Sequence, residues 1–181
     1  MGIISDLAVA DAGVPLAVMT YYNIVLRAGH RRMASTLAQA GVAGAIVPDL
    51  PVDELDGWGV EAAIAGVDVV LLVAPTTPDA RLKQICSRSR GFVYGVAVMG
   101  VTGERVSLGP SAVAVAARCK AETDTPVLIG VGVSSAEQAR EMVTVADGVV
   151  VGSALVHRLL EGGGPEGAAA FVSELRAAID S

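Results

Sequence analysis

Aromatic residues are scarce in this chain of 181 residues, where one Trp, three Tyr and two Phe make up only 3% of the sequence. Hydrophobic residues nevertheless account for 52%, so the core must be built from Val, Ala, Leu and Ile. Such a core is typical of α/β proteins that bury a parallel sheet. The length suffices for one domain and is short for two. We therefore expect one α/β domain over residues 1–181.

Basic residues are in the minority, with 13 Lys and Arg against 19 Asp and Glu and a net charge of −6. Proteins that bind nucleic acid need basic patches, so this balance argues against a nucleic-acid partner. A small phosphorylated molecule remains a candidate ligand, because the N-terminus of a helix binds phosphate without net positive charge on the protein.

Cysteine is rare as well, and the spacing of Cys86 and Cys119 matches no metal site. This usage suits the reducing cytoplasm. No apolar run is long enough to span a bilayer, and the N-terminus lacks the cationic region of a secretory signal peptide. We therefore expect a cytoplasmic protein with no metal and no membrane contact.

Strand-like and helix-like segments alternate strictly along the chain. The expected strands are Pro15–Met19, Ala43–Val47, Asp68–Val73, Gly91–Val96 and two runs that begin at Pro126 and Asp147. A helix tail is expected over residues 1–13, βα units over 15–161 and a C-terminal helix over 165–180. Alternation of this kind predicts a parallel sheet with right-handed crossovers.

The number of units points to an incomplete barrel. A closed (β/α)₈ barrel needs eight units and typically about 250 residues, whereas this chain has about six and opens within a helix. We expect the last six βα units of such a barrel, with the first two missing. The alternative is an open, doubly wound sheet that is complete as it stands. Against it, no Gly-x-Gly-x-x-Gly follows the first strand.

Two consecutive strands end in glycine and serine. The first leads into Gly130-Val131-Gly132-Val133-Ser134-Ser135, and the second into Gly152-Ser153 before an apolar helix pattern. A strand that passes through Gly-Ser into a helix presents free backbone N–H groups and the positive end of a helix dipole. The pair predicts a phosphate site, and the alternative is ordinary turn glycines with N-cap serines.

Four segments lie where strands are expected to end, namely Met19–Asn23, Pro48–Glu54, Gly100–Gly103 and the two Gly/Ser ends. In order and spacing they resemble the alpha subunit of tryptophan synthase along essentially the whole chain. The resemblance implies cleavage of indole-3-glycerol phosphate to indole and glyceraldehyde 3-phosphate. It also implies no cofactor in this chain, and an α₂β₂ assembly with a beta subunit that carries pyridoxal phosphate.

The same resemblance implies roles for individual residues. Substrate and phosphate binding would fall to Tyr94, Thr102, Gly103, Gly132, Gly152 and Ser153, and the subunit interface to Asn23, Asp49 and Pro51. Tyr94 could instead be a half-buried core residue, and Asp49 an ordinary turn aspartate. The long segment 97–109, which contains Thr102, would be either a lid or a surface loop.

The catalytic pair of the family is a glutamate and an aspartate on the first two βα units. The resemblance therefore implies that no residue of this chain has either role, and we expect the chain alone to be inactive. Two alternatives remain: a non-catalytic, shortened paralogue that binds a phosphorylated ligand or a beta subunit, and another phosphate-binding barrel from histidine, tryptophan or thiamine biosynthesis. The Pro48–Pro51 segment argues against the latter.

Overall fold

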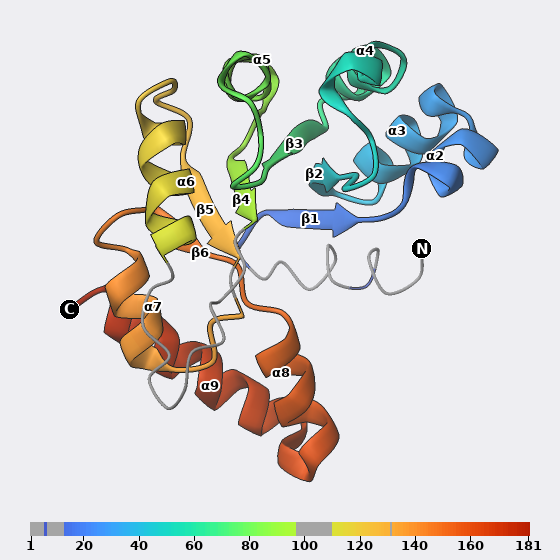
Figure 1. Cartoon of the computed structure of the whole chain (residues 1–181). Coiled ribbons are helices and arrows are strands. Elements are labelled where there is room, and N and C mark those ends of the chain that lie inside the picture. Colours follow the sequence, from blue (N-terminus) through green and yellow to red (C-terminus); the bar gives the residue numbers. More distant parts are fainter. Residues whose placement is uncertain (1–5, 7–12, 97–109, 131) are drawn as a thin grey trace.

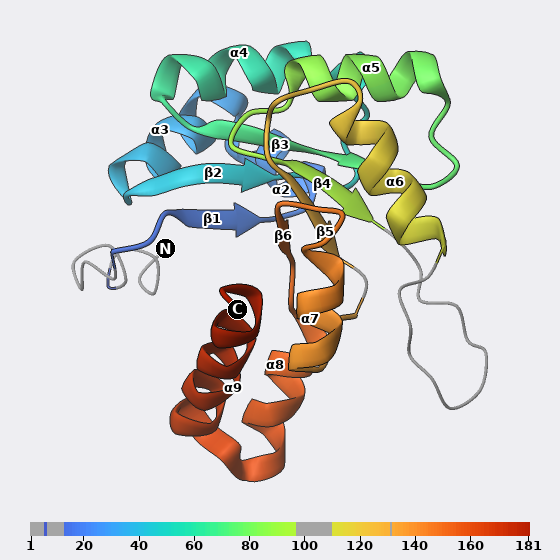
Figure 2. The ribbon, with the colours of Figure 1, turned by 90° about the vertical axis from the view of Figure 1, so that its left-hand side faces the viewer.

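The computed structural model describes residues 6, 13–96, 110–130 and 132–181. Within them, six strands form one sheet in the sequential order β1-β2-β3-β4-β5-β6, and every neighbouring pair is parallel. The strands are β1 (Leu16–Met19), β2 (Val42–Ile46), β3 (Asp68–Val73), β4 (Val93–Val96), β5 (Val127–Gly130) and β6 (Gly148–Val149). The sheet curls, with helices along its convex side (Figures 1 and 2).

Helices connect the strands in the expected alternation. They are α2 (Tyr22–Ala28), α3 (His30–Gln39), the 3₁₀ turn η1 (Val52–Glu54), α4 (Asp56–Ala65), α5 (Asp79–Arg88), α6 (Pro110–Lys120), α7 (Ala136–Met142), α8 (Ser153–Arg158), the π-helical turn η2 (Leu159–Gly163) and α9 (Gly164–Ile179). Pro165 near the first turn of α9 suits a helix start, because its missing N–H has no partner there in any case.

The strand order confirms the barrel-type fold predicted from the sequence. In a doubly wound sheet the order reverses at a switch point, whereas here each strand pairs with its neighbours in sequence. β3 has the predicted bounds. One element was missed, because α2 begins at Tyr22, within the Met19–Asn23 segment expected at a strand end. The helix tail expected over residues 1–13 lies almost entirely outside the described residues.

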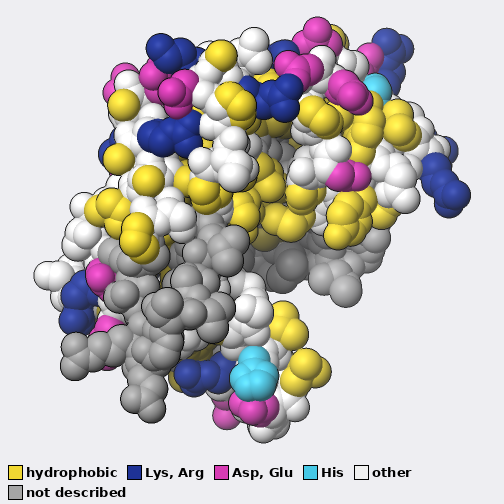
Figure 3. All heavy atoms as spheres, in the orientation of Figure 1, with side chains coloured by type: hydrophobic (Ala, Val, Ile, Leu, Met, Phe, Trp, Pro, Cys, Tyr) yellow, Lys and Arg dark blue, Asp and Glu magenta, His cyan; other side chains and the backbone are white. Residues whose placement is uncertain are grey.

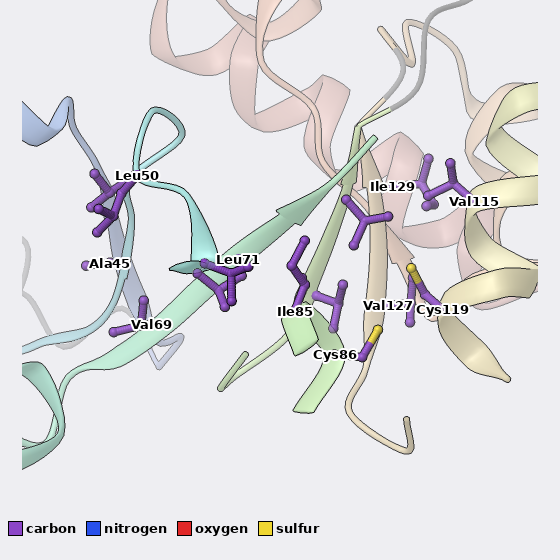
Figure 4. Close-up of a cluster of buried hydrophobic side chains, with 14 of the residues drawn as sticks. Ala45, Leu50, Val69, Leu71, Ile85, Cys86, Val115, Cys119, Val127 and Ile129 are labelled. Atoms are coloured by element: carbon purple, nitrogen blue, oxygen red, sulfur yellow. The ribbon is translucent and has the colours of Figure 1, made fainter. Parts of the chain in front are cut away.

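The core lies between the convex side of the sheet and the helices. Alternate strand residues such as Val69, Leu71 and Val73 of β3 are buried there, as strand geometry requires. Branched aliphatic side chains dominate, and Figure 4 shows them with Cys86 of α5 and Cys119 of α6. The core is therefore the one expected from a composition rich in Val, Ala, Leu and Ile.

Burial decides the chemistry of the two thiols. Both cysteines are free and buried. Burial and, to a smaller extent, the neighbouring Cys86 raise the pKa of the Cys119 thiol to about 12. The thiolate is the reactive form of cysteine, so Cys119 is a packing residue rather than a nucleophile at neutral pH.

Two polar side chains join elements at the amino-terminal end of the sheet. The fully buried Ser89 hydroxyl accepts from the Leu71 N–H (3.0 Å) and donates to the Phe92 carbonyl (2.6 Å). The Asp147 carboxylate accepts from Lys120 Nζ (2.5 Å) and from the Val127 N–H (2.8 Å). The Lys120 and Val127 hydrogen bonds lower the pKa of Asp147. Ser89 and Asp147 therefore hold the starts of the strands together.

We expect Asp147→Asn to lower the free energy of unfolding by about 1 kcal/mol at pH 7, since the Asp147 side chain is 39% exposed and the solvent screens the pair. Because the folded pKa is lowered, the carboxylate contributes fully above the unfolded pKa of about 3.9. Its contribution is lost as the pH falls from about 4 through the folded value. Urea unfolding at several pH values measures this. Asp124→Asn, in the α6–β5 turn, is the control, and equal losses for the two variants would contradict the assignment.

The two outer strands have one neighbour each among the described residues, since β1 pairs with β2 and β6 with β5. β1 is uncharged, and Met19 at its end is 52% exposed. Figure 3 shows hydrophobic side chains along the concave side of the sheet, while charged groups gather on the outer helices. Unpaired apolar strand edges are templates for pairing with another chain.

We expect the purified chain to self-associate at micromolar concentration, because pairing of these edges removes them from water. Light scattering measures the molar mass. Met19→Lys should reduce association by placing a charge at the β1 edge. Ala80→Lys, at an exposed position of α5, adds the same charge elsewhere and should leave association unchanged. A monodisperse, cooperatively melting monomer would contradict the prediction.

Candidate functional site at the carboxyl ends of the strands

The loop after β2 is joined to the start of α2. Asp49 Oδ1 accepts a hydrogen bond from the Tyr22 N–H at 2.8 Å. The helix has no side-chain cap of its own at Tyr21, so the carboxylate satisfies a free N–H group and opposes the positive helix end. Asp49 is therefore more than a turn residue, because it holds the start of α2, which lies 27 positions earlier in the chain.

The predicted interface residues lie near this contact. Asn23 is exposed on the first turn of α2 rather than at a strand end as expected, because the capped helix begins one residue earlier. Pro51 is exposed just before η1. Three apolar side chains at or on α2 are exposed as well, namely Tyr21, Ile24 and Leu26, by 66%, 50% and 55%. Ile24 and Leu26 lie two positions apart and therefore face different sides of the helix.

A second set of contacts joins α2 to α3 and α4. The Tyr22 hydroxyl lies 3.1 Å from His30 Nε2, and the Tyr22 and His30 rings stack at 5.8 Å. His30 in turn meets the fully buried Trp58 edge-on. His30 and Trp58 are therefore packing residues that support α2.

Tyr94 lies on the inner side of β4 and crosses to the end of β5. It is half-buried, and a Cβ atom on Gly130 would lie 2.5 Å from the Tyr94 hydroxyl and ring. Only glycine at position 130 therefore leaves room for this phenol. Burial raises the pKa of Tyr94, so the hydroxyl stays protonated at neutral pH. The sequence singled out Tyr94 but missed the role of Gly130.

The two predicted glycine sites occupy equivalent places on adjacent strands. Ile129 of β5 pairs with Val149 of β6, and the Val150 N–H bonds to the Ile129 carbonyl. Gly132 lies three residues after Ile129, and Gly152 lies three residues after Val149. Both are exposed, and a Cβ atom on either would touch nothing within 4 Å. Gly132 has φ +68°, a conformation that favours glycine.

The helix that follows β5 has no free N-terminus. The Ser135 hydroxyl accepts from the Gln138 N–H (3.4 Å), and the Ser134 N–H donates to Gln138 Oε1 (2.8 Å). Hydrogen bonds from its own backbone N–H and from the Ser135 hydroxyl lower the pKa of Glu137. Its carboxylate adds a negative charge at this helix end. Ser-x-x-Gln is the signature of a capping box and could have been read in the sequence.

The helix that follows β6 is different. α8 begins at Ser153, and its N-cap Gly152 makes no side-chain hydrogen bond. The first intrahelical N–H donors are Leu155 and Val156, so the N–H groups of Ser153 and Ala154 point out of the helix end without an intrahelical acceptor. Of the two predicted strand ends, Gly152-Ser153 is therefore the open one.

Three of the acidic side chains that follow β2 and β3 are held in structural contacts. Asp49 binds the Tyr22 N–H, Asp53 pairs with Arg81 (2.6 Å), and Asp79 pairs with Arg118 (2.7 Å). Within the described ranges, no group of three or more His, Cys, Asp and Glu residues could hold a metal ion, and no helix is long and apolar enough to cross a membrane.

A shallow cavity of about 210 Å³ lies between the loop after β2 and α5. Its lining includes Asp49 and Pro51, together with Leu72, Thr77 and Arg81, which the sequence analysis did not single out. Thr102 and Gly103, and with them the expected lid over 97–109, lie outside the described residues.

Comparison with known proteins gives a consistent result. The family model for the tryptophan synthase alpha chain matches residues 1–178. The tryptophan synthase alpha chain of Streptomyces coelicolor is 47% identical over 167 residues, or 90% of this chain and 62% of the relative. That of Methanocaldococcus jannaschii is 43% identical over 143 residues, or 79% and 51%.

Solved structures agree. A structure of tryptophan synthase from Mycobacterium tuberculosis superposes with a TM-score of 0.87 at 41% identity and covers 98% of this chain and 66% of that one. A mutant alpha subunit from Pyrococcus furiosus gives 0.87 at 36% identity, with 97% and 71% covered. The chain spans about three fifths of the length of its curated relatives. With matches in sequence and in structure over nearly all its length, the chain belongs to the tryptophan synthase alpha chain family.

Proposed function

We propose that this chain carries the phosphate-binding and partner-binding parts of a tryptophan synthase alpha subunit. The reaction of the whole enzyme would be cleavage of indole-3-glycerol phosphate to indole and glyceraldehyde 3-phosphate, which is lyase chemistry in tryptophan biosynthesis. The observation that supports it best is the open N-terminus of α8 at Gly152-Ser153, in line with Gly132, in a chain of this family.

The phosphate would be held by backbone groups. The N–H groups of Ser153 and Ala154 and the Ser153 hydroxyl are donors at the positive end of α8, and Gly152 leaves space for close approach. Gly132 provides the matching space at the end of β5. Thr102 and Gly103 would complete the site from the loop after β4.

Tyr94 would bound the rest of the substrate. Its ring lies over Gly130, two residues before Gly132, so an indole ring attached to a bound glycerol phosphate would extend toward it. The protonated hydroxyl can donate or accept a hydrogen bond. Tyr94 would therefore position the substrate and take no part in proton transfer.

The partner would be a beta subunit that carries the pyridoxal phosphate, while this chain carries no cofactor. The exposed Tyr21 and Ile24 at the start of α2 would supply apolar contacts, beside Asn23 on the same turn and Asp49 and Pro51 of the loop after β2. The hydrogen bond from the Tyr22 N–H to Asp49 holds the start of α2 in the free chain, which would lower the ordering cost of association.

We expect glycerol phosphate to bind the wild-type chain and to bind Gly152→Asp at least tenfold more weakly. The new carboxylate would face the phosphate, and repulsion between like charges about 4 Å apart near a protein surface is worth about 4 kcal/mol. Titration calorimetry measures both affinities. Gly167→Asp, on α9 where a Cβ also meets nothing within 4 Å, is the matched control. Equal affinity for the wild type and Gly152→Asp would rule the site out.

We expect no cleavage of indole-3-glycerol phosphate by the purified chain alone. Cleavage needs a base for the indole N–H and an acid for indole C3, and each such group contributes on the order of 10²–10⁴ in rate. Asp49, Asp53 and Asp79, which follow β2 and β3, are already engaged in structural contacts. Indole release is the assay, with a full-length relative as positive control. Release above the buffer background would show that this chain supplies its own acid and base. Phosphate binding without cleavage would favour a non-catalytic binding role for the chain.

A further inference from the structure

A larger cavity, of about 450 Å³, opens at the other end of the sheet, where the strands begin. It lies between the second half of α4, the start of β3 and the segment that follows α5. The lining includes Leu55, Val60, Val67, Val69, Arg88 and Arg90. Its volume is in the range of small-molecule sites, and no residue of the candidate site described above belongs to it.

One side of the cavity is apolar. Leu55, Val67 and Val69 are buried, while Val60 on α4 is 58% exposed. Gly59 packs closely against this side, since a Cβ atom there would lie 3.2 Å from Leu55 Cγ. Val60 therefore supplies the accessible apolar surface of the cavity, with the buried side chains behind it.

The other side is cationic. Arg90 Nη1 donates to the carbonyls of Ser87 (3.0 Å) and Ser89 (2.9 Å), which fixes the side chain. No carboxylate of the described residues pairs with it, whereas Arg88 is paired with Asp56 and bonds to the Val52 carbonyl. Arg90 is therefore a held guanidinium with free donors and no counter-ion.

One acidic residue also borders the cavity. Asp68 opens β3, and its neighbours Val67 and Val69 belong to the buried core beneath the helices. Since strand side chains alternate between faces, the Asp68 carboxylate turns to the opposite face, where Oδ2 would lie 3.3 Å from a Cβ on Gly91. It does not neutralise Arg90, with which it forms no ion pair.

From this arrangement we propose that the cavity binds a small amphipathic anion, an acidic head group on a short apolar chain. The head group, a carboxylate or a phosphate, accepts hydrogen bonds from the free donors of Arg90, which suit planar and tetrahedral oxyanions alike. The chain lies against the exposed Val60. The ligand would leave the carboxyl ends of the strands free, so the site is independent of the proposed lyase function.

Titration calorimetry of the purified chain with octanoate and with octyl phosphate, below their micelle concentrations, tests the proposal and identifies the head group. Octylamine has the same chain with the opposite charge. We expect saturable binding of at least one anion and none of octylamine. Arg90→Gln should weaken binding on the order of tenfold by removing the charged donor. Arg32→Gln, an exposed arginine of α3 with no ion pair in the described part of the chain, should leave it unchanged.

A second variant separates loss of the site from loss of the fold. Val60→Asp replaces an exposed side chain, so it leaves the core intact while placing a negative charge on the apolar wall, and we expect it to abolish binding. The proposal is overturned if neither anion binds, if octylamine binds as well as the anions, or if Arg90→Gln and Arg32→Gln bind alike.

Discussion

The parallel hydrogen-bond ladder from β1 to β6 is the constraint on which the rest of the structure depends. Each strand pairs with its neighbours in chain order, so every connection must return along the same convex side through a helix. All carboxyl ends consequently meet at one edge of the curled sheet, and all amino ends at the other. Asp49, Tyr94 and Gly152 lie at the same edge of the sheet because the ladder is continuous and sequential.

Glycine residues let the strands of this ladder pack closely against neighbouring side chains. A Cβ atom on Gly95 would lie 2.3 Å from Ile129 Cδ1 and 3.0 Å from Val115 Cγ1, so glycine lets α6 pack closely over β4. Gly130, one strand further along, opens space on the inner side for the Tyr94 ring. The two glycines thus set the fit of the core and of the candidate site. The shortage of aromatic residues agrees with this close packing, since large rings would need wider spacing between layers.

The two ends of the sheet use polar groups differently. At the amino ends, Ser89 and Asp147 satisfy backbone N–H groups and join elements, which serves stability. At the carboxyl ends, α8 leaves its first N–H groups without such partners, and α2 exposes apolar side chains. Barrel enzymes divide stability and chemistry between their two faces in the same way. Arg90 and its cavity are the exception, a charged group without a counter-ion on the stabilising end.

The sequence by itself determined the alternation of strands and helices, the barrel type of sheet, the family and the Gly/Ser ends of the last two strands. The alternation and the type of sheet follow from hydrophobic periodicity, and the Gly/Ser ends are read from adjacent residues. The family followed from the resemblance of four segments in order and spacing. The cap that closes α7 belongs with these features, since Ser135-x-x-Gln138 lies within one segment of the sequence. Only the tertiary structure decided that Asp49 caps α2 and that Tyr94 needs glycine at position 130. Both are contacts between different βα units, which depend on strand register and sheet curvature, so neither is expressed in the sequence of any single segment.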